Sequence, residues 1–179
     1  MRGNLIDGRP ALVLLSGPPG AGKTTFASRL ANLTGANHLE SDAVRHRLFL
    51  SPSYGRSESA TVFAEVERRA RADLAAGHSA IIDATNLTRR DRARFVALAD
   101  RMQALTVGVR LTAPMSVLRA RVRRRAETGS GGYSSAGEAV LERMVDRGEP
   151  FRIPCLVVDT RFSQAPSLEL VALLMEAPR

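Results

Sequence analysis

The segment Ala11-Leu12-Val13-Leu14-Leu15-Ser16-Gly17-Pro18-Pro19-Gly20-Ala21-Gly22-Lys23-Thr24 decides the fold of this 179-residue chain. Its first part, residues 11–15, is a short apolar run of the kind that forms a buried parallel strand. A glycine, four further residues and Gly-Lys-Thr follow. Beyond them, apolar residues recur at helical spacing, at Phe26, Ala27, Leu30, Ala31 and Leu33. A strand, a glycine-rich loop and a helix in this order predict a phosphate-binding loop at a helix N-terminus.

Lys23 is the only lysine among the 26 lysines and arginines of the chain. A compact ammonium fits between the β- and γ-phosphates of a nucleoside triphosphate, where the wider guanidinium fork fits badly. The hydroxyl of Thr24 is the expected Mg²⁺ ligand beside it. No Asn-Lys-x-Asp guanine motif exists, which favours ATP over GTP. We therefore predict that ATP and Mg²⁺ bind this loop, through Gly17, Pro18, Pro19, Gly20, Ala21, Gly22, Lys23, Thr24 and Thr25.

Composition places the chain among globular proteins of one domain, residues 1–179. A net charge of +8 favours anionic partners such as a nucleotide, a sugar phosphate or a nucleic acid. A basic, solvated surface from an arginine-rich genome is the alternative. The single cysteine, Cys155, excludes an internal disulfide and predicts a cytoplasmic protein. No apolar run approaches the roughly 20 residues of a membrane helix, and residues 1–10 lack the apolar core of a signal peptide.

Strand and helix patterns alternate along the whole chain. After the first strand, apolar runs at residues 80–82, 105–111 and 156–159 and a short segment at 37–40 predict four more strands, with helical patterns between them. Thr88 and Asp91 have the spacing of a helix cap. Alternating strands and helices favour a doubly wound parallel sheet. The predicted fold is an α/β three-layer sandwich around a five-stranded parallel sheet.

A helix rich in arginine and a glycine-rich stretch are predicted to form a lid over residues 114–135. Pro114 stands at the start of the helix, where its missing N–H costs little. The stretch 128–134 then contains three glycines, and Ser135 and Glu138 have the spacing of a capping box for the next helix. A mobile segment beside arginines suits an element that closes over phosphates. The alternative is a surface loop after a solvated helix face.

Asp42 and Arg45 follow the second predicted strand. In an open parallel sheet the carboxyl ends of the strands line the ligand crevice, so Asp42 is expected across from the phosphate loop. A carboxylate there is able to accept the proton of an attacking hydroxyl. Arg45, three residues on, would share its helical side and hold an anionic acceptor. Capping of a helix by Ser41 or Asp42 is the competing interpretation.

Asp83 ends the next buried strand, in the sequence Asp83-Ala84-Thr85-Asn86. An acidic residue at this position holds Mg²⁺ directly or through water in phosphate-loop enzymes. Thr85 and Asn86 would then emerge into the crevice and hydrogen-bond the acceptor. A turn at Asn86, followed by a helix that Thr88 caps, is the alternative.

Together, four segments resemble those of small P-loop kinases of the polynucleotide-kinase-like and zeta-toxin-like group. They are GPPGAGKTT (17–25), ESDAVRHRL (40–48), AIIDATN (80–86) and RARVRRR (119–125). The resemblance implies that Asp42 is the general base and that Arg45 contacts a phosphate or acidic group of the acceptor. It implies that Arg121 and Arg125, four apart on one helical face, brace the γ-phosphoryl group. Arg92 matches an arginine after the DATN segment and is expected among the acceptor-binding residues, and Ser135 stands where relatives often have aspartate.

These observations predict an ATP-dependent kinase that transfers the γ-phosphoryl group of ATP to an acceptor hydroxyl. The acceptor is either a nucleic-acid or nucleotide 5′-hydroxyl or a small molecule such as a sugar, nucleotide sugar, antibiotic or metabolite. A nucleotide-dependent switch or ATPase without an acceptor is the third hypothesis. The Asp42-x-x-Arg45 pattern argues against the third, and the lack of an extra nucleic-acid module weighs against the first. The sequence leaves the oligomeric state open.

Overall fold

The computed structural model describes residues 9–128, 137–145 and 148–176. These parts of the chain form five strands and seven helices, and strands and helices alternate as the periodicity predicts. In chain order they are β1 (Ala11–Ser16), α1 (Lys23–Thr34), β2 (Asn37–Glu40), α2 (Ser41–Leu48), α3 (Arg56–Ala75), β3 (Ala80–Asp83), α4 (Arg89–Arg101), β4 (Leu105–Thr112), α5 (Met115–Thr128), α6 (Glu138–Val145), β5 (Cys155–Asp159) and α7 (Ala165–Glu176).

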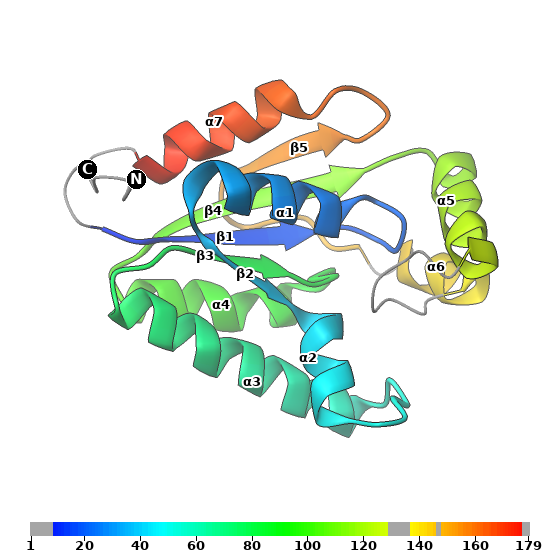
Figure 1. The fold of residues 1–179 in the computed structure, drawn as a ribbon, viewed down its shortest axis with the longest axis horizontal. Coiled ribbons are helices and arrows are strands. Elements are labelled where there is room, and N and C mark those ends of the chain that lie inside the picture. Colours follow the sequence, from blue (N-terminus) through cyan, green and yellow to red (C-terminus); the bar gives the residue numbers. More distant parts are fainter. Residues whose placement is uncertain (1–8, 129–136, 146–147, 177–179) are drawn as a thin grey trace.

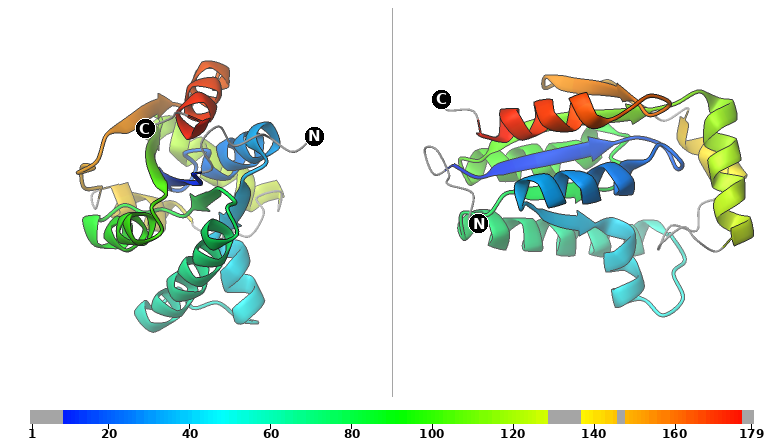
Figure 2. Two further views of the ribbon diagram at one scale, coloured as in Figure 1. Left: turned by 90° about the vertical axis from the view of Figure 1, so that its left-hand side faces the viewer. Right: turned by 45° about the horizontal axis from the view of Figure 1, so that its top comes forward.

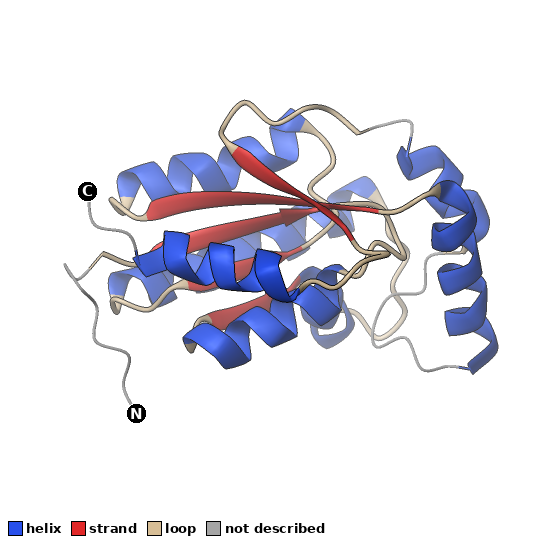
Figure 3. Ribbon diagram, turned by 90° about the horizontal axis from the view of Figure 1, so that it is seen from above, coloured by secondary structure: helices blue, strands red, loops and turns tan. Residues whose placement is uncertain are grey.

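The five strands pair in parallel in the order β2-β3-β1-β4-β5. Helices α1 and α7 cover one face of the sheet, and α3 and α4 cover the other (Figures 1 and 2). Seen along the sheet, the strands lie between the two helix layers (Figure 3). The predicted three-layer sandwich around a five-stranded parallel sheet is confirmed.

The central strand β1 is apolar on both faces because both faces are covered. Ala11, Val13 and Leu15 belong to the core cluster that contains side chains of α1 and α7. Leu12 and Leu14 belong to the cluster that contains side chains of α3 and α4. All six residues of β1 are buried. Successive side chains of a strand point to opposite faces, so a central strand of such a sandwich needs the continuous apolar run seen in the sequence.

Local signals in the sequence set several helix ends. Thr88 forms the predicted capping box, with Thr88 Oγ1 accepting from the Asp91 N–H at 3.2 Å. Gly77 follows α3 with a left-handed φ of 78°. The carbonyl of Pro114 accepts from the first turn of α5, so this proline lies at the helix start as expected. The predicted capping box at Ser135 and the glycine-rich half of the lid lie outside the described residues.

The carboxyl ends of the strands all point to one edge of the sheet, where α2, α5 and α6 lie (Figure 1). This edge therefore brings together the phosphate loop, Asp42 and Asp83, which come from different parts of the chain. Within the described ranges, no helix is both long and apolar enough to cross a membrane.

Candidate active site

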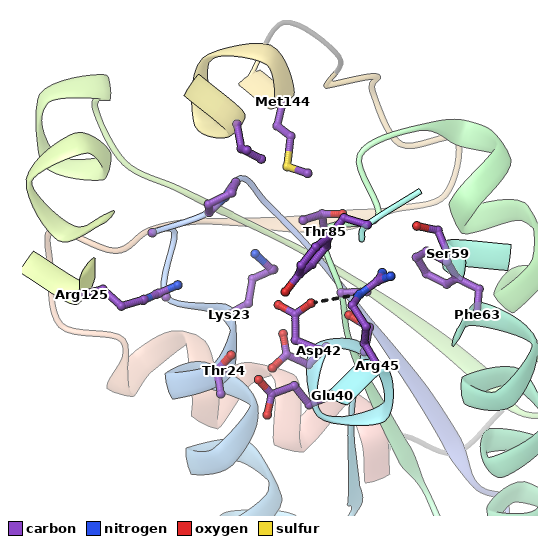
Figure 4. A pocket seen from close by; sticks show the side chains of 18 of the residues that line it. Lys23, Thr24, Glu40, Asp42, Arg45, Ser59, Phe63, Thr85, Arg125 and Met144 are labelled. Atoms are coloured by element: carbon purple, nitrogen blue, oxygen red, sulfur yellow. Dashed lines mark ion pairs between the residues drawn. The ribbon is translucent and has the colours of Figure 1, made fainter. Parts of the chain in front are cut away.

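A cavity of about 610 Å³ lies at the carboxyl ends of β1, β2 and β3. Its walls come from the loop before α1, from α2, from the start of α3, from the end of β3 and from both α5 and α6. The last of these walls, made by Val140, Arg143 and Met144 of α6, was not predicted. Figure 4 shows that Arg125 reaches in from the side opposite Phe63 and Ser59, with Lys23 between them. The predicted site residues that line the cavity are Pro19, Gly20, Gly22, Lys23, Thr24, Thr25, Asp42, Arg45, Asp83, Thr85 and Arg125.

The phosphate loop is built from glycines in left-handed conformations. Gly20 and Gly22 have φ of 79° and 87°, and Gly22 stands directly before α1. The Gly17 N–H donates to the Thr85 carbonyl at 3.1 Å, which ties the loop to the end of β3. A Cβ on Gly20 would lie 2.9 Å from the Leu118 carbonyl oxygen, so α5 packs against the loop too closely for a side chain. The loop therefore opens onto the N-terminus of α1, where backbone N–H groups favour an anion.

Lys23 points into the loop that precedes it. Its Nζ donates to the carbonyls of Gly17 at 2.9 Å and Pro18 at 3.1 Å. Burial lowers the pKa of Lys23, and the nearby carboxylates of Asp83 and Asp42 partly offset this effect. The Lys23 ammonium thus lies at the loop with carboxylates nearby, in a position to pair with an oxygen of a bound triphosphate.

Asp83 is 3% exposed at the end of β3, and its Oδ2 lies 3.0 Å from His38 Nε2 on the neighbouring strand β2. A histidine N–H at this distance orients a carboxylate. Mg²⁺ in nucleotide sites is held by one or two protein oxygens together with phosphates and water. A hydroxyl from Thr24 and a carboxylate from Asp83, lining one cavity, fit this ligand set. Sequence analysis missed His38, because only the pairing of β2 with β3 brings it to Asp83.

Glu40 is a second acidic group that the sequence analysis missed. It lies at the last position of β2, in register with Asp83 on β3, and it lines the cavity. Burial raises the pKa of Glu40, and the negative charges of Asp83 and Asp42 raise it further. The sequence could have indicated Glu40, because it lies at a predicted strand end, two residues before Asp42. Glu40, Asp42 and Asp83 all line the cavity, and Figure 4 shows the carboxylates of Glu40 and Asp42 close together below Lys23.

Arg45 lines the cavity and is 5% exposed, and its Nε is buried without a hydrogen-bond partner among the described residues. One guanidinium N–H donates to Glu58, and Nε lies 3.8 Å from an oxygen of Asp42. The guanidinium also stacks 4.5 Å from the ring centroid of Tyr54. Glu58, in the first turn of α3, was not predicted, although an acidic residue in a first helical turn is a recognisable capping signal.

Glu58 holds the segment before α3 as well as Arg45. Its carboxylate accepts from the Ser53 N–H at 2.6 Å, from the Ser53 hydroxyl at 2.7 Å and from the Tyr54 N–H at 3.1 Å. Burial by itself would raise the pKa of Glu58, but these hydrogen bonds, together with that from Arg45, lower it to about 2. Glu58 is therefore ionised at neutral pH.

The two arginines predicted to brace the γ-phosphoryl group have different surroundings. Arg125 lines the cavity. Arg121 does not: it donates to the Gly20 carbonyl at 3.1 Å and to Thr160, at 2.8 Å to the hydroxyl and 2.9 Å to the carbonyl. Arg121 thus joins the phosphate loop to the end of β5. Arg121 was expected to contact the phosphoryl group, but its guanidinium contacts the loop and Thr160.

Asn86 and Arg92, predicted to contact the acceptor, do not line the cavity. Asn86 has a left-handed φ of 43°, and its side chain turns under β1 to donate to the Leu15 carbonyl at 2.8 Å. Arg92 donates to four backbone carbonyls of residues 86, 87, 149 and 150 and stacks 4.4 Å from the ring centroid of Phe151. Both side chains are buried and hold the β3–α4 connection in place.

Comparisons with known proteins agree with this geometry. A family model described as "AAA domain" matches residues 12–151. An uncharacterized protein of Mycobacterium tuberculosis is 32% identical over 154 residues, which cover 79% of this chain and 31% of that protein. This chain thus spans about a third of the relative's length.

Two solved structures share the fold. The crystal structure of a candidate kinase from Chloroflexus aurantiacus has a TM-score of 0.77 and 25% identity, covering 92% of this chain and 97% of that one. The structure of Chaetomium thermophilum Kti12 in complex with ADP-AlF3 has a TM-score of 0.75 and 17% identity, covering 92% and 98%.

Proposed function

The chain belongs to the AAA domain family, and from this premise we propose that it is an ATP-dependent phosphotransferase that moves the γ-phosphoryl group of ATP to a hydroxyl of an acceptor. One observation supports this most directly: Lys23, Asp42 and Asp83 line one cavity with the phosphate loop at the N-terminus of α1. Phosphoryl transfer requires mainly positioning and charge stabilisation, and this cavity supplies groups for both.

In the proposed mechanism each group has one task. The loop N–H groups and Lys23 hold the triphosphate, and Thr24 and Asp83 would hold Mg²⁺, which when bound neutralises charge on the phosphates. Asp42 aligns the acceptor hydroxyl and takes its proton. Arg125, on the α5 side of the cavity, stabilises charge that develops on the transferred group.

The acceptor end of the cavity is the part beside α2, α3 and α6. Arg45 and Thr85 line it. A nucleic-acid 5′-hydroxyl and a small hydroxyl compound are both candidate acceptors for this end. The presence of a carboxylate at Asp42 favours transfer over a switch or ATPase without acceptor, because simple phosphate binding needs no base at that place.

The test is transfer of label from γ-labelled ATP to pools of sugars, polyols, nucleosides and 5′-hydroxyl oligonucleotides. We expect label in an acceptor with the wild-type protein, and none with Lys23→Ala or Asp42→Asn. Asp42→Asn should still bind ADP, because the loop is unchanged. Asp100→Asn makes the same chemical change at an exposed position of α4 and should behave like the wild type.

Label released only as inorganic phosphate, at equal rates from the wild type and Asp42→Asn, would show that the protein is an ATPase or switch. Full transfer by Asp42→Asn would remove this residue from the role of base.

A further inference from the structure

Resting on the proposed kinase function, we propose that the acceptor is a small, uncharged hydroxyl compound, and that Glu58 excludes acceptors that bear a phosphate or carboxylate next to Arg45. The basis is the pairing of Arg45 within the protein. The sequence pattern predicted that Arg45 holds an anionic group of the acceptor, but one N–H of its guanidinium already donates to the Glu58 carboxylate.

The charges around Arg45 leave no surplus of positive charge. Glu58 is ionised at neutral pH, since its pKa is about 2, and an oxygen of Asp42 lies 3.8 Å from Arg45 Nε. One cation therefore stands between two carboxylates. An acceptor phosphate approaching Arg45 would meet a net negative charge in a poorly hydrated place, and like charges brought together at such a site are strongly unfavourable.

The rest of the acceptor end is suited to an uncharged molecule. Tyr54, Phe63, Val140 and Met144 give it apolar walls, and Ser53, Ser59 and Thr85 add hydroxyl groups. Figure 4 shows Phe63 and Ser59 beside Arg45, with Met144 above them. Apolar walls with a few hydroxyls are suited to a hydroxylated ring or chain. Arg143 also lines the cavity, and its side chain is exposed.

Part of the basic charge at the surface is paired within the protein. Among the described residues, many surface arginines are paired with carboxylates: Arg68 and Arg69 with Glu65, Arg71 and Arg101 with Glu67, Arg119 with Glu142, Arg123 with Glu138, and Arg161 with Asp159. Nucleic acid binding needs cations that neutralise a run of phosphates. These seven arginines are therefore less available to a run of phosphates than the sequence alone suggests.

A binding experiment tests the role of Glu58 without any turnover. The protein is first saturated with a non-hydrolysable ATP analogue and Mg²⁺, and methyl phosphate is then titrated in a calorimeter. We expect no Arg45-dependent binding to the wild type. Glu58→Gln, which keeps the shape but removes the charge, should bind methyl phosphate at least about tenfold more tightly. The double variant Glu58→Gln, Arg45→Met should lose this gain.

Methyl phosphate binding by the wild type that Arg45→Met abolishes would overturn the inference. So would the absence of any gain in Glu58→Gln. Should Glu58→Gln fail to fold, the comparison of the wild type with Arg45→Met still decides whether Arg45 accepts an anion.

A transfer experiment with matched acceptors separates this inference from the kinase proposal. Ribose, glucose and thymidine are each compared with a phosphorylated counterpart, and a 5′-hydroxyl oligonucleotide is added to the set. Label on the uncharged members is the expected result. Preferential labelling of phosphorylated members or of the oligonucleotide would overturn the inference and leave the kinase function standing. Release of phosphate alone, unchanged by Asp42→Asn, would instead refute the kinase function. If no member accepts label, the calorimetric titration decides.

Discussion

Replacement of Arg121 by methionine should affect mainly stability, whereas replacement of Arg125 should affect mainly turnover. Both arginines lie on α5, four residues apart, and both were predicted to brace the transferred phosphoryl group. In the structure Arg121 makes three hydrogen bonds, one to the Gly20 carbonyl at 3.1 Å and two to Thr160 at 2.8 and 2.9 Å. Arg125 lines the cavity. We therefore expect Arg121→Met to lower stability and Arg125→Met to lower turnover.

The size of the effect follows from these contacts. Hydrogen bonds to a charged group contribute about 1.5–3 kcal/mol in net terms, and methionine keeps most of the apolar stem. Because Arg121 is only half-buried, we expect a loss of about 2 kcal/mol in the free energy of unfolding. For a chain of this size, that corresponds to a fall of roughly 4–8 °C in Tm. Arg125→Met should change the free energy of unfolding by less than about 0.5 kcal/mol.

Urea unfolding, thermal melting and ADP titration measure these quantities. Arg121→Met should also weaken ADP binding, because the phosphate loop loses its link to β5. Arg125→Met should bind ADP nearly as the wild type does, while its kcat falls by about 10²–10³-fold if the guanidinium stabilises the transferred group.

An Arg121→Met protein that melts like the wild type and loses only kcat would contradict this assignment. An Arg125→Met protein that loses about 2 kcal/mol of stability would contradict it equally. Either result would mean that the contacts of α5 in solution differ from those described.

Three further predictions concern the loop, an acid transition and a helix cap. Gly20→Ala should abolish nucleotide binding, because its Cβ would lie 2.9 Å from a backbone oxygen. The control is Gly35→Ala, where φ is 73° and no atom lies within 4 Å of the added Cβ. It should lower the free energy of unfolding by about 1–2 kcal/mol and leave the affinity for ADP unchanged in a titration. The pKa of Glu58 in the folded protein is lowered from 4.5 to about 2, so its ionised form stabilises the fold fully above about pH 4.5. The difference in the free energy of unfolding between the wild type and Glu58→Gln, measured by urea unfolding, should therefore shrink as the pH falls from 4.5 towards 2. Thr88→Ala should lower the free energy of unfolding by about 1 kcal/mol in the same assay, since it removes the capping box of α4.

Much of the fold was predictable because its signals are local. The apolar run of β1 follows from burial on both faces, and the Thr88–Asp91 spacing produces the cap that the structure contains. Asp42 and Asp83 could be placed at one edge because strands of a parallel sheet present their carboxyl ends together. Glu40 was available by the same rule and was overlooked.

Other parts of the site depend on pairings that no local pattern encodes. His38 meets Asp83 only because β2 pairs with β3, and Glu58 meets Arg45 only because α3 packs beside α2. Asn86 was expected to face an acceptor, but its left-handed backbone turns the side chain under β1 instead. Each of these contacts joins elements that are set side by side by packing of the whole core.

The order of residues along the chain was enough to predict the glycine-rich loop between β1 and α1, since a strand, a glycine turn and a helix start within one short segment shape it through local backbone conformation. Helical spacing likewise placed Arg121 and Arg125 on one face of α5. Only the packing of α5 across the loop decided that Arg121 would bind Gly20 and Thr160 while Arg125 lines the cavity. Spacing determines which side chains share a face of a helix, but the neighbours of that face depend on long-range packing, and the charge of each neighbour decides the chemistry.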